Sequence, residues 1–364
     1  MRLVHTLVVG GLLLISANAL ALPRFAAQTG WKCQSCHVNP TGGGMRQTLG
    51  VQYGRETLPV PEWSKDLELE DFSTLLTNFL GVGADLRTMY YYRQVPPVNG
   101  TGDSTNNAFW QMEGNLHLNF RLAKKVNIYL SKGLYSGFEV FGMLNVLPAN
   151  GYVKVGKFTP GYGLRIDDHT AWIRLKTGFS PETGRPERTG FELGVNPGIF
   201  SVLGGLYNAA EGFGLSGSQK SGLVRAEALT SLSEQIHLGL GGNAFFSRTP
   251  TGIRQDRYGG FGMFSYDNFS ILGEADLLKD GETTGLVTWA EMNIGIIHGL
   301  GLTLSYDFFD EDTSVKAGSM SRYGFGLEFY PISGVEVRPM YRIAKEKPDD
   351  RPDNDFVMIL HFYL

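Results

Sequence analysis

The sequence is poor in cysteine, in charge and in long hydrophobic runs. It holds 2 cysteines in 364 residues, too few for a disulfide-stabilised scaffold. Charged residues make up 19% of the chain and the formal net charge is -4, so no nucleic-acid partner is expected. Beyond the N-terminus there is no run of about 20 apolar residues, which excludes a bundle of membrane-spanning helices.

Glycine and aromatic residues are abundant instead. The chain has 48 glycines, 23 phenylalanines, 16 tyrosines and 5 tryptophans. Because 42% of its residues are hydrophobic, the chain has enough apolar surface to fold, and disorder is excluded. Its mean hydropathy is only -0.10, so it is not hydrophobic throughout. These values leave a large β protein or an unusual globular enzyme.

Residues 1–21 have the pattern of a secretory signal peptide. Arg2 precedes an apolar stretch over residues 7–15, and two overlapping A-x-A cleavage sites follow. We expect cleavage after Ala21, with Ala19 as the alternative. The apolar stretch is too short to cross a membrane, so an N-terminal anchor is the less favoured interpretation. The mature chain is therefore predicted to be exported.

Both cysteines fall in one motif, Cys33-Gln34-Ser35-Cys36-His37. In an exported chain, C-x-x-C-H is typical of c-type haem attachment. The two thiols can each form a thioether to one haem vinyl group, and the adjacent His37 is then held at the iron as proximal ligand. The alternatives are a structural disulfide and a redox-active C-x-x-C pair. A redox pair would be expected in a βαβ context, which the flanking sequence lacks.

The predicted cytochrome segment, residues 22–70, is short. Three consecutive glycines at 42–44, together with Pro59 and Pro61, interrupt regular structure within it. So small a segment can hardly enclose a haem and also form its own core. The rest of the chain is expected to cover the haem.

Residues 75–364 show the alternation expected of β-strands. At 301–308, for example, apolar residues at even positions alternate with small or polar residues at odd positions. Segments of about ten residues with this pattern are typical of transmembrane β-barrels, in which one strand face meets lipid and the other the lumen. The expected strands are 80–94, 107–122, 126–132, 137–147, 151–158, 189–196, 199–206, 222–231, 235–247, 256–266, 269–279, 285–295, 300–309, 321–330, 334–343 and 355–364.

The connections between these strands alternate between tight turns and longer polar loops. Outer-membrane barrels have short periplasmic turns, longer outer loops and both termini in the periplasm. The predicted fold is therefore all-β: a 16-stranded antiparallel transmembrane β-barrel with a short N-terminal c-type haem-binding segment. We expect it in the bacterial outer membrane, in contact with lipid, with its N-terminus in the periplasm. Sixteen strands leave room for an aqueous channel.

An exported C-x-x-C-H followed by a sixteen-stranded barrel resembles the family of fused monohaem cytochrome c and outer-membrane porin proteins, which includes the cytochrome–porin iron oxidases. The segment 25–37, FAAQTGWKCQSCH, is similar to the stretch leading into the haem site of that family. The segment 38–46, VNPTGGGMR, departs from the pattern of the iron oxidases. The resemblance thus covers the architecture but is specific only near the haem.

The resemblance implies one covalent haem c and electron transfer across the outer membrane. It also implies a periplasmic cytochrome c or other redox protein as one partner and an extracellular electron donor or acceptor as the other. It supports an electron carrier more strongly than an enzyme, although oxidation of extracellular Fe(II) is one activity of the family. No catalytic residues are assigned.

The sixth ligand of the haem iron has several candidates. Met45 follows the glycine run and could fold back over the haem, although an ordinary linker methionine is the alternative. His117, His237 and His361 fall on the predicted lumen face near the periplasmic ends of their strands. Each of these could also be a plain pore-lining histidine. A thioether ligand would raise the redox potential of the haem, and an imidazole would lower it.

The longest predicted loop, 159–188, is expected to fold inward and narrow the channel. It contains Asp167, Asp168 and His169, a set of oxygen and nitrogen donors that could bind ferrous iron transiently. The alternative is that the two carboxylates pair with Arg165 or Arg174.

Two functions from different classes follow from these patterns. The first is a one-haem electron conduit in an outer membrane. The second is a diffusion porin whose haem segment senses redox state or plugs the periplasmic mouth. An enzyme acting on a small oxidant at an open haem face is a third option, and it requires that the sixth ligand be absent.

Overall fold

The computed structural model describes residues 23–65, 73–95, 104–134, 137–183, 186–209, 219–348 and 352–364. The predicted signal peptide, 1–21, lies outside these residues. Within the described part of the chain, no helix is long and apolar enough to span a membrane.

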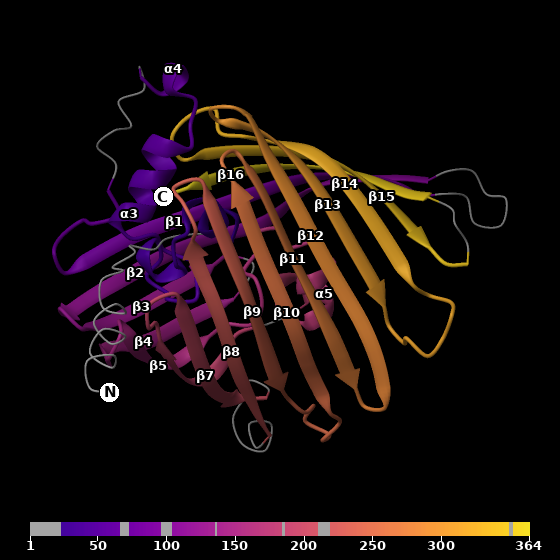
Figure 1. Ribbon diagram of the computed structural model, residues 1–364, viewed down its shortest axis with the longest axis horizontal. Helices are drawn as coiled ribbons and strands as arrows, with labels where there is room; N and C mark the ends of the chain where they lie inside the picture. Colours follow the sequence, from indigo (N-terminus) through magenta and orange to yellow (C-terminus); the bar gives the residue numbers. More distant parts are fainter. Residues whose placement is uncertain are drawn as a thin grey trace, which may run out of the picture.

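Sixteen antiparallel strands close into one barrel (Figure 1), which confirms the predicted fold class. Each strand pairs with its neighbours in sequence, and β16 pairs with β1 to close the ring. The strands are β1 Leu80–Val95, β2 Ser104–Ala123, β3 Val126–Gly133, β4 Phe138–Leu147, β5 Gly151–Phe158, β6 Arg188–Val195, β7 Phe200–Asn208, β8 Lys220–Ser231, β9 Ile236–Phe246, β10 Gln255–Tyr266, β11 Phe269–Asp280, β12 Thr283–Ile297, β13 Leu300–Asp310, β14 Met320–Phe329, β15 Val335–Glu346 and β16 Pro352–Tyr363.

The alternation in the sequence becomes the two faces of the barrel wall. On β9, Leu238 and Leu240 face outward and are exposed, whereas His237 faces the lumen and is buried. Met112 stands between Gln111 and Glu113, so strict alternation predicts it on the outer face; it lies instead inside the barrel, 1% exposed. The reason is a β-bulge: the register of β1 and β2 shifts between Arg87 and Thr88, which turns the next residues to the other face.

The connections sort into two ends of the barrel, here called the turn end and the loop end. At the turn end, tight connections reverse the chain with residues of positive φ, among them Asn150, Asp267 and Gly198. The loop end carries the longer connections, such as 311–319 between β13 and β14.

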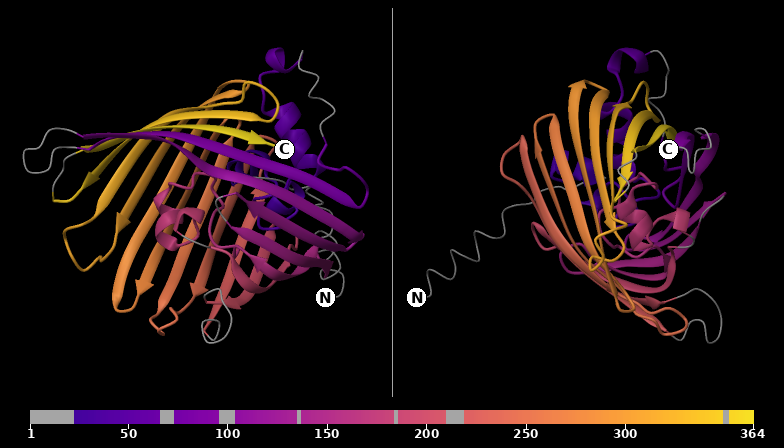
Figure 2. Two further views of the ribbon diagram at one scale, coloured as in Figure 1. Left: turned by 180° about the vertical axis from the view of Figure 1, so that it is seen from behind. Right: turned by 90° about the vertical axis from the view of Figure 1, so that its right-hand side faces the viewer.

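Two segments reach into the lumen, although α4 of the first lies exposed beyond the end of the barrel (Figure 1). The first is the N-terminal segment, 23–65, drawn in indigo at the end of the barrel that also holds the C-terminus (Figure 2). It contains α2 Pro23–Thr29, η1 Cys33–Ser35, α3 Thr48–Gln52, η2 Tyr53–Thr57 and α4 Pro61–Ser64. The second is the connection between β5 and β6, 159–187, which folds inward as predicted and contains α5 Trp172–Thr177 and η4 Pro181–Thr183.

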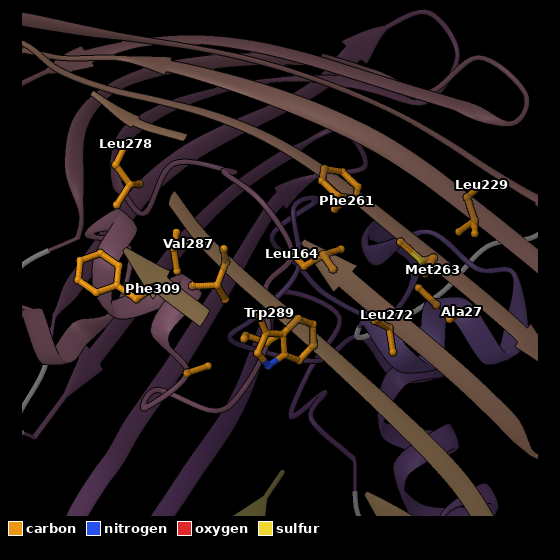
Figure 3. Close-up of a cluster of buried hydrophobic side chains, with 14 residues drawn as sticks. Ala27, Leu164, Leu229, Phe261, Met263, Leu272, Leu278, Val287, Trp289 and Phe309 are labelled. Carbon is orange, nitrogen blue, oxygen red and sulfur yellow. The ribbon is translucent and has the colours of Figure 1, made fainter. Parts of the chain in front are cut away.

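An apolar core joins both inserted segments to the barrel wall (Figure 3). Ala27 of α2 and Leu164 of the inward connection pack with Phe261, Met263 and Trp289 of the wall. Side chains of the barrel interior, which in an open channel would meet water, are therefore packed against protein. Burial of this apolar surface holds the two segments inside the barrel.

Candidate haem site inside the barrel

The C-x-x-C-H motif forms a single tight turn. The backbone N–H groups of Cys36 and His37 both donate to the carbonyl of Cys33, at 3.2 and 3.0 Å. This turn places the two thiols and the imidazole on one short stretch of chain. Both thiols are free rather than joined in a disulfide. Burial raises the pKa of Cys33 to about 11 and that of Cys36 to about 12, so both are neutral thiols near neutral pH.

The imidazole of His37 is oriented by the glycine turn that follows it. Gly42, Gly43 and Gly44 all have positive φ, which bends the chain back so that His37 pairs with Arg46 in an antiparallel bridge. The Nδ1 of His37 lies 3.3 Å from the carbonyl oxygen of Gly44. With Nδ1–H donating to that carbonyl, the other ring nitrogen, Nε2, carries the free lone pair. Metal-ligating histidines commonly use this backbone hydrogen bond.

Burial keeps this imidazole neutral. His37 is 4% exposed, and desolvation together with the nearby Arg46 lowers its pKa to about 3. A neutral imidazole is the form that binds iron.

A cavity of about 60 Å³ lies beside the motif, and we call it the aromatic cavity. Cys36 and His37 line it together with His361. The aromatic side chains on its walls are Phe25, Tyr53, Tyr330 and Tyr363. The aromatic side chains, Cys36 and the neutral His37 are groups that a covalent porphyrin would use. The same cavity is also lined by the charged residues Arg24, Arg46, Arg87, Asp167 and Glu336, and Cys33 is not part of its wall.

A second cavity, of about 150 Å³, adjoins the first, and we call it the polar cavity. His37 lines it as well, together with His117 and His169, but Cys36 does not. Its walls carry many charged groups, including Arg87 and Glu113, which form an ion pair at 2.8 Å. Such walls suit water and ions better than the apolar face of a porphyrin.

Two of the four candidate sixth ligands lie away from the aromatic cavity. Met45 is 1% exposed and packs against the wall: a Cβ at Gly81 would lie 2.5 Å from its Cε. His237 faces the lumen as predicted, but its Nδ1 lies 2.8 Å from Ser231 Oγ, next to the end of α2 at Gly30. Neither residue lines either cavity.

The other two candidates, His117 and His361, share one carboxylate. Asp85 accepts from His117 Nε2 at 3.0 Å and from His361 Nε2 at 3.1 Å, and it also pairs with Arg46 at 2.9 Å. The Nδ1 of His361 lies 3.0 Å from Glu336, and the Nδ1 of His117 lies 3.0 Å from the hydroxyl of Tyr129. The structure thus brings both histidines to the barrel wall facing the motif.

The three candidate residues for an external iron site each form an ion pair or hydrogen bond with a different residue. Asp167 pairs with Arg338 of β15, and Asp168 accepts from Thr170 Oγ1 at 2.7 Å. His169 Nδ1 lies 3.3 Å from Glu182. Among the described residues, no group of three or more histidine, cysteine, aspartate or glutamate side chains is arranged to hold a metal ion.

The expected ion pairs of Asp167 and Asp168 with Arg165 or Arg174 are wrong. Arg165 instead donates to the carbonyl of Gly42 at 2.8 Å, and Arg174 donates to that of Phe179 at 2.9 Å. The carboxylates pair with arginines of the barrel wall because the connection folds deep into the lumen.

Sequence reasoning did not single out the residues that tie the motif to the wall. Asp85 and Lys154 are the main examples: Lys154 is fully buried, pairs with Glu192 at 2.7 Å and donates to Asn39 Oδ1 at 3.1 Å. The ammonium of Lys154 also lies 4.0 Å from the ring centre of Phe158. In the sequence, Asp85 and Lys154 could have been noticed because each is a charged residue on the lumen face of a predicted strand.

The sequence matches no known family model and no curated protein. In its fold the chain is similar to outer-membrane proteins of known structure. It superposes on OmpT of Vibrio cholerae with a TM-score of 0.56 at 10% identity, over 80% of this chain and 100% of that one. It is also similar to OprB of Pseudomonas putida (TM-score 0.54, 10% identity, 78% and 94% coverage). For the anion-selective porin from Comamonas acidovorans the values are 0.52, 11%, 78% and 99%.

Proposed function

We propose that the protein is an electron carrier of the bacterial outer membrane, with one haem c attached through Cys33 and Cys36 and ligated by His37. The observation that carries this proposal is a C-x-x-C-H turn inside a porin-like barrel, where Cys36 and His37 line a cavity together with His361 and four aromatic side chains. The hydrogen bond between His37 and Gly44 supports it, because it leaves Nε2 available to the iron. When bound, the haem would supply a one-electron Fe(II)/Fe(III) couple.

His361 is our candidate for the second axial ligand. It lines the same cavity as Cys36 and His37, and Glu336 at its Nδ1 is the carboxylate partner that commonly orients a metal-ligating histidine. If Nε2 leaves Asp85 for the iron, that carboxylate keeps Arg46 and His117 as partners. The net loss of polar contacts at Asp85 would therefore be small.

The remaining residues exclude water and balance charge around the cavity. The aromatic walls and the closed barrel separate the site from bulk solvent. Arg24, Arg46 and Arg87 line the cavity together with the carboxylates Asp167 and Glu336, and these arginines would be available to pair with the anionic propionates of a haem. The partners in electron transfer would be a periplasmic redox protein on the inner side and an extracellular donor or acceptor, with Fe(II) as one candidate donor.

Absorption and electron paramagnetic resonance spectra of the purified protein test this proposal. We expect a reversible c-type α-band, one haem per chain after denaturation, and a low-spin ferric signal with two axial imidazoles. The control is the variant Cys33→Ser/Cys36→Ser, produced in the same cells, which should lack covalent haem. A wild-type chain folded as a barrel but without covalent haem would overturn the proposal.

A diffusion porin is the second candidate, because the similar structures include an anion-selective porin. In that case the N-terminal segment would plug the barrel or sense redox state. The packed lumen favours a barrel that encloses the N-terminal segment over an open diffusion channel.

A further inference from the structure

A large basic vestibule opens at the turn end, beside the C-x-x-C-H turn. Its volume is about 940 Å³, at the upper end of the range of roughly 300–1,000 Å³ for small-molecule sites. Gln34 and Ser35, the two residues between the cysteines, form part of its wall, as does Val38 directly after His37. The vestibule therefore connects the surface at the turn end with the segment that would carry the haem.

The charged residues in the described wall of this vestibule are all positive. Arg121, Lys124 and Lys125 line it, and no aspartate or glutamate is among the described residues of its wall. Lys124 and Lys125 form the exposed turn between β2 and β3. Within the described ranges, none of these three cations has an ion pair with a carboxylate. Most of the remaining polar wall consists of the uncharged amides Gln34, Gln47, Asn78, Asn119, Asn127, Asn145 and Asn150.

We propose that this vestibule is the docking site of an acidic redox protein that exchanges one electron with the haem. A concave surface of one sign attracts a partner of opposite charge and raises its association rate. A protruding acidic surface that enters the vestibule would reach Gln34 and Ser35, the two residues between the cysteines that would hold the haem. One electron passes between the two redox centres, and no bond forms or breaks. This inference rests on the proposed function.

The first experiment measures binding and needs no haem. Fluorescently labelled poly-L-glutamate serves as the acidic probe, and its anisotropy is followed on the full-length protein in detergent at low salt. The test variant is Lys124→Glu/Lys125→Glu. The matched control is Lys316→Glu/Lys347→Glu, which changes the net charge equally but lies in exposed connections of the loop end.

We expect the turn-end variant to bind the probe about tenfold more weakly, within the range of charge effects on association. The loop-end control should bind like wild type, and added salt should weaken wild-type binding. Equal binding by all three proteins, or equal loss in both variants, would overturn the docking site.

The second experiment measures the rate of electron transfer from the haem to a soluble probe. The ferrous protein is mixed with hexacyanoferrate(III), an anion, or with tris(phenanthroline)cobalt(III), a cation; the haem iron becomes ferric and the probe gains the electron. The turn-end variant should react about tenfold more slowly with the anion and no more slowly with the cation. Unchanged rates with both probes would contradict the docking site while leaving the haem proposal intact. A chain without haem would refute the proposed function and, with it, the electron exchange, whatever the binding experiment shows.

One competing occupant belongs to the chain itself. The segment 66–71 contains Asp66, Glu68, Glu70 and Asp71 and lies outside the described residues. The variant with these four residues changed to their amides separates the two cases. Unchanged affinity for poly-L-glutamate supports an external partner. A tenfold gain would make this segment the occupant and overturn the proposal.

Discussion

The two cysteines lie in surroundings that keep their thiols protonated. Burial raises both pKa values, to about 11 for Cys33 and about 12 for Cys36. Because the thiolate is the nucleophile, a haem-free chain should alkylate slowly at pH 8. The rate should rise about tenfold per pH unit up to the pKa, since the thiolate fraction does so.

Mass spectrometry of iodoacetamide-treated, haem-free protein between pH 8 and 10 checks this prediction. A denatured sample of the same protein is the control, because its thiols should react as free cysteine does. Equal rates in the folded and denatured samples would contradict the burial of the motif.

The axial ligand gives a second prediction at this scale. His361→Ala should convert the ferric haem from low spin to high spin, because the second imidazole is lost. His117→Ala is the matched control, since it removes the other partner of Asp85 but not the ligand. Electron paramagnetic resonance separates the two cases. A low-spin signal in His361→Ala that is lost in His117→Ala would move the ligand to His117.

The sequence predicted the C-x-x-C-H motif, but not which of the three lumen histidines lies opposite it in the folded protein. Alternation assigns His117, His237 and His361 to the lumen, which the structure confirms. It does not give their positions relative to the N-terminal segment. The folding of that segment into the lumen decides this: His237 meets the end of α2, whereas His361 meets the aromatic cavity.

At the scale of elements, β5 and the N-terminal segment are joined by one buried cation. Lys154→Met should destabilise the protein by about 3–5 kcal/mol, because it leaves Glu192 buried without its cation. The double variant Lys154→Met/Glu192→Gln should recover most of this loss. Urea unfolding in lipid vesicles measures the free energy of unfolding. A single variant as stable as wild type would show that the buried pair of Lys154 and Glu192 does not stabilise the protein.

The sequence predicted the bounds of the strands well, but it did not predict the ion-pair partners of the inward connection. The strand β9, expected at 235–247, spans Ile236–Phe246. The arginine partners of Asp167 and Asp168 could not be predicted, because Arg338 lies 171 residues away from Asp167 along the chain. Local periodicity carries no information about such contacts. The bulge at Met112 also has no signature in a pattern of alternating residues.

For the whole molecule, the packed lumen predicts a closed channel. Liposomes containing the full-length protein should swell in small sugars at least about tenfold more slowly than liposomes with an open porin of similar strand number. Deleting residues 23–65 should restore swelling, because that segment fills the turn end. Shortening the inward connection, 164–179, provides a second variant that keeps the motif. Free swelling by the full-length protein would favour the diffusion-porin alternative.

The closure of the barrel also constrains the order of maturation. β16 pairs with β1, the N–H of Leu364 donates to Ala84 at 2.8 Å, and the hydroxyl of Tyr363 donates to Gly54 of the enclosed segment at 3.2 Å. Strand β16 thus completes a ring around part of the N-terminal segment. Cys36 is 4% exposed inside it, so a ligation enzyme would reach the thiols only while that ring is open. Any prosthetic group on Cys33 and Cys36 must therefore be installed before the final strand docks, which makes biogenesis a sequence of covalent loading first and insertion second.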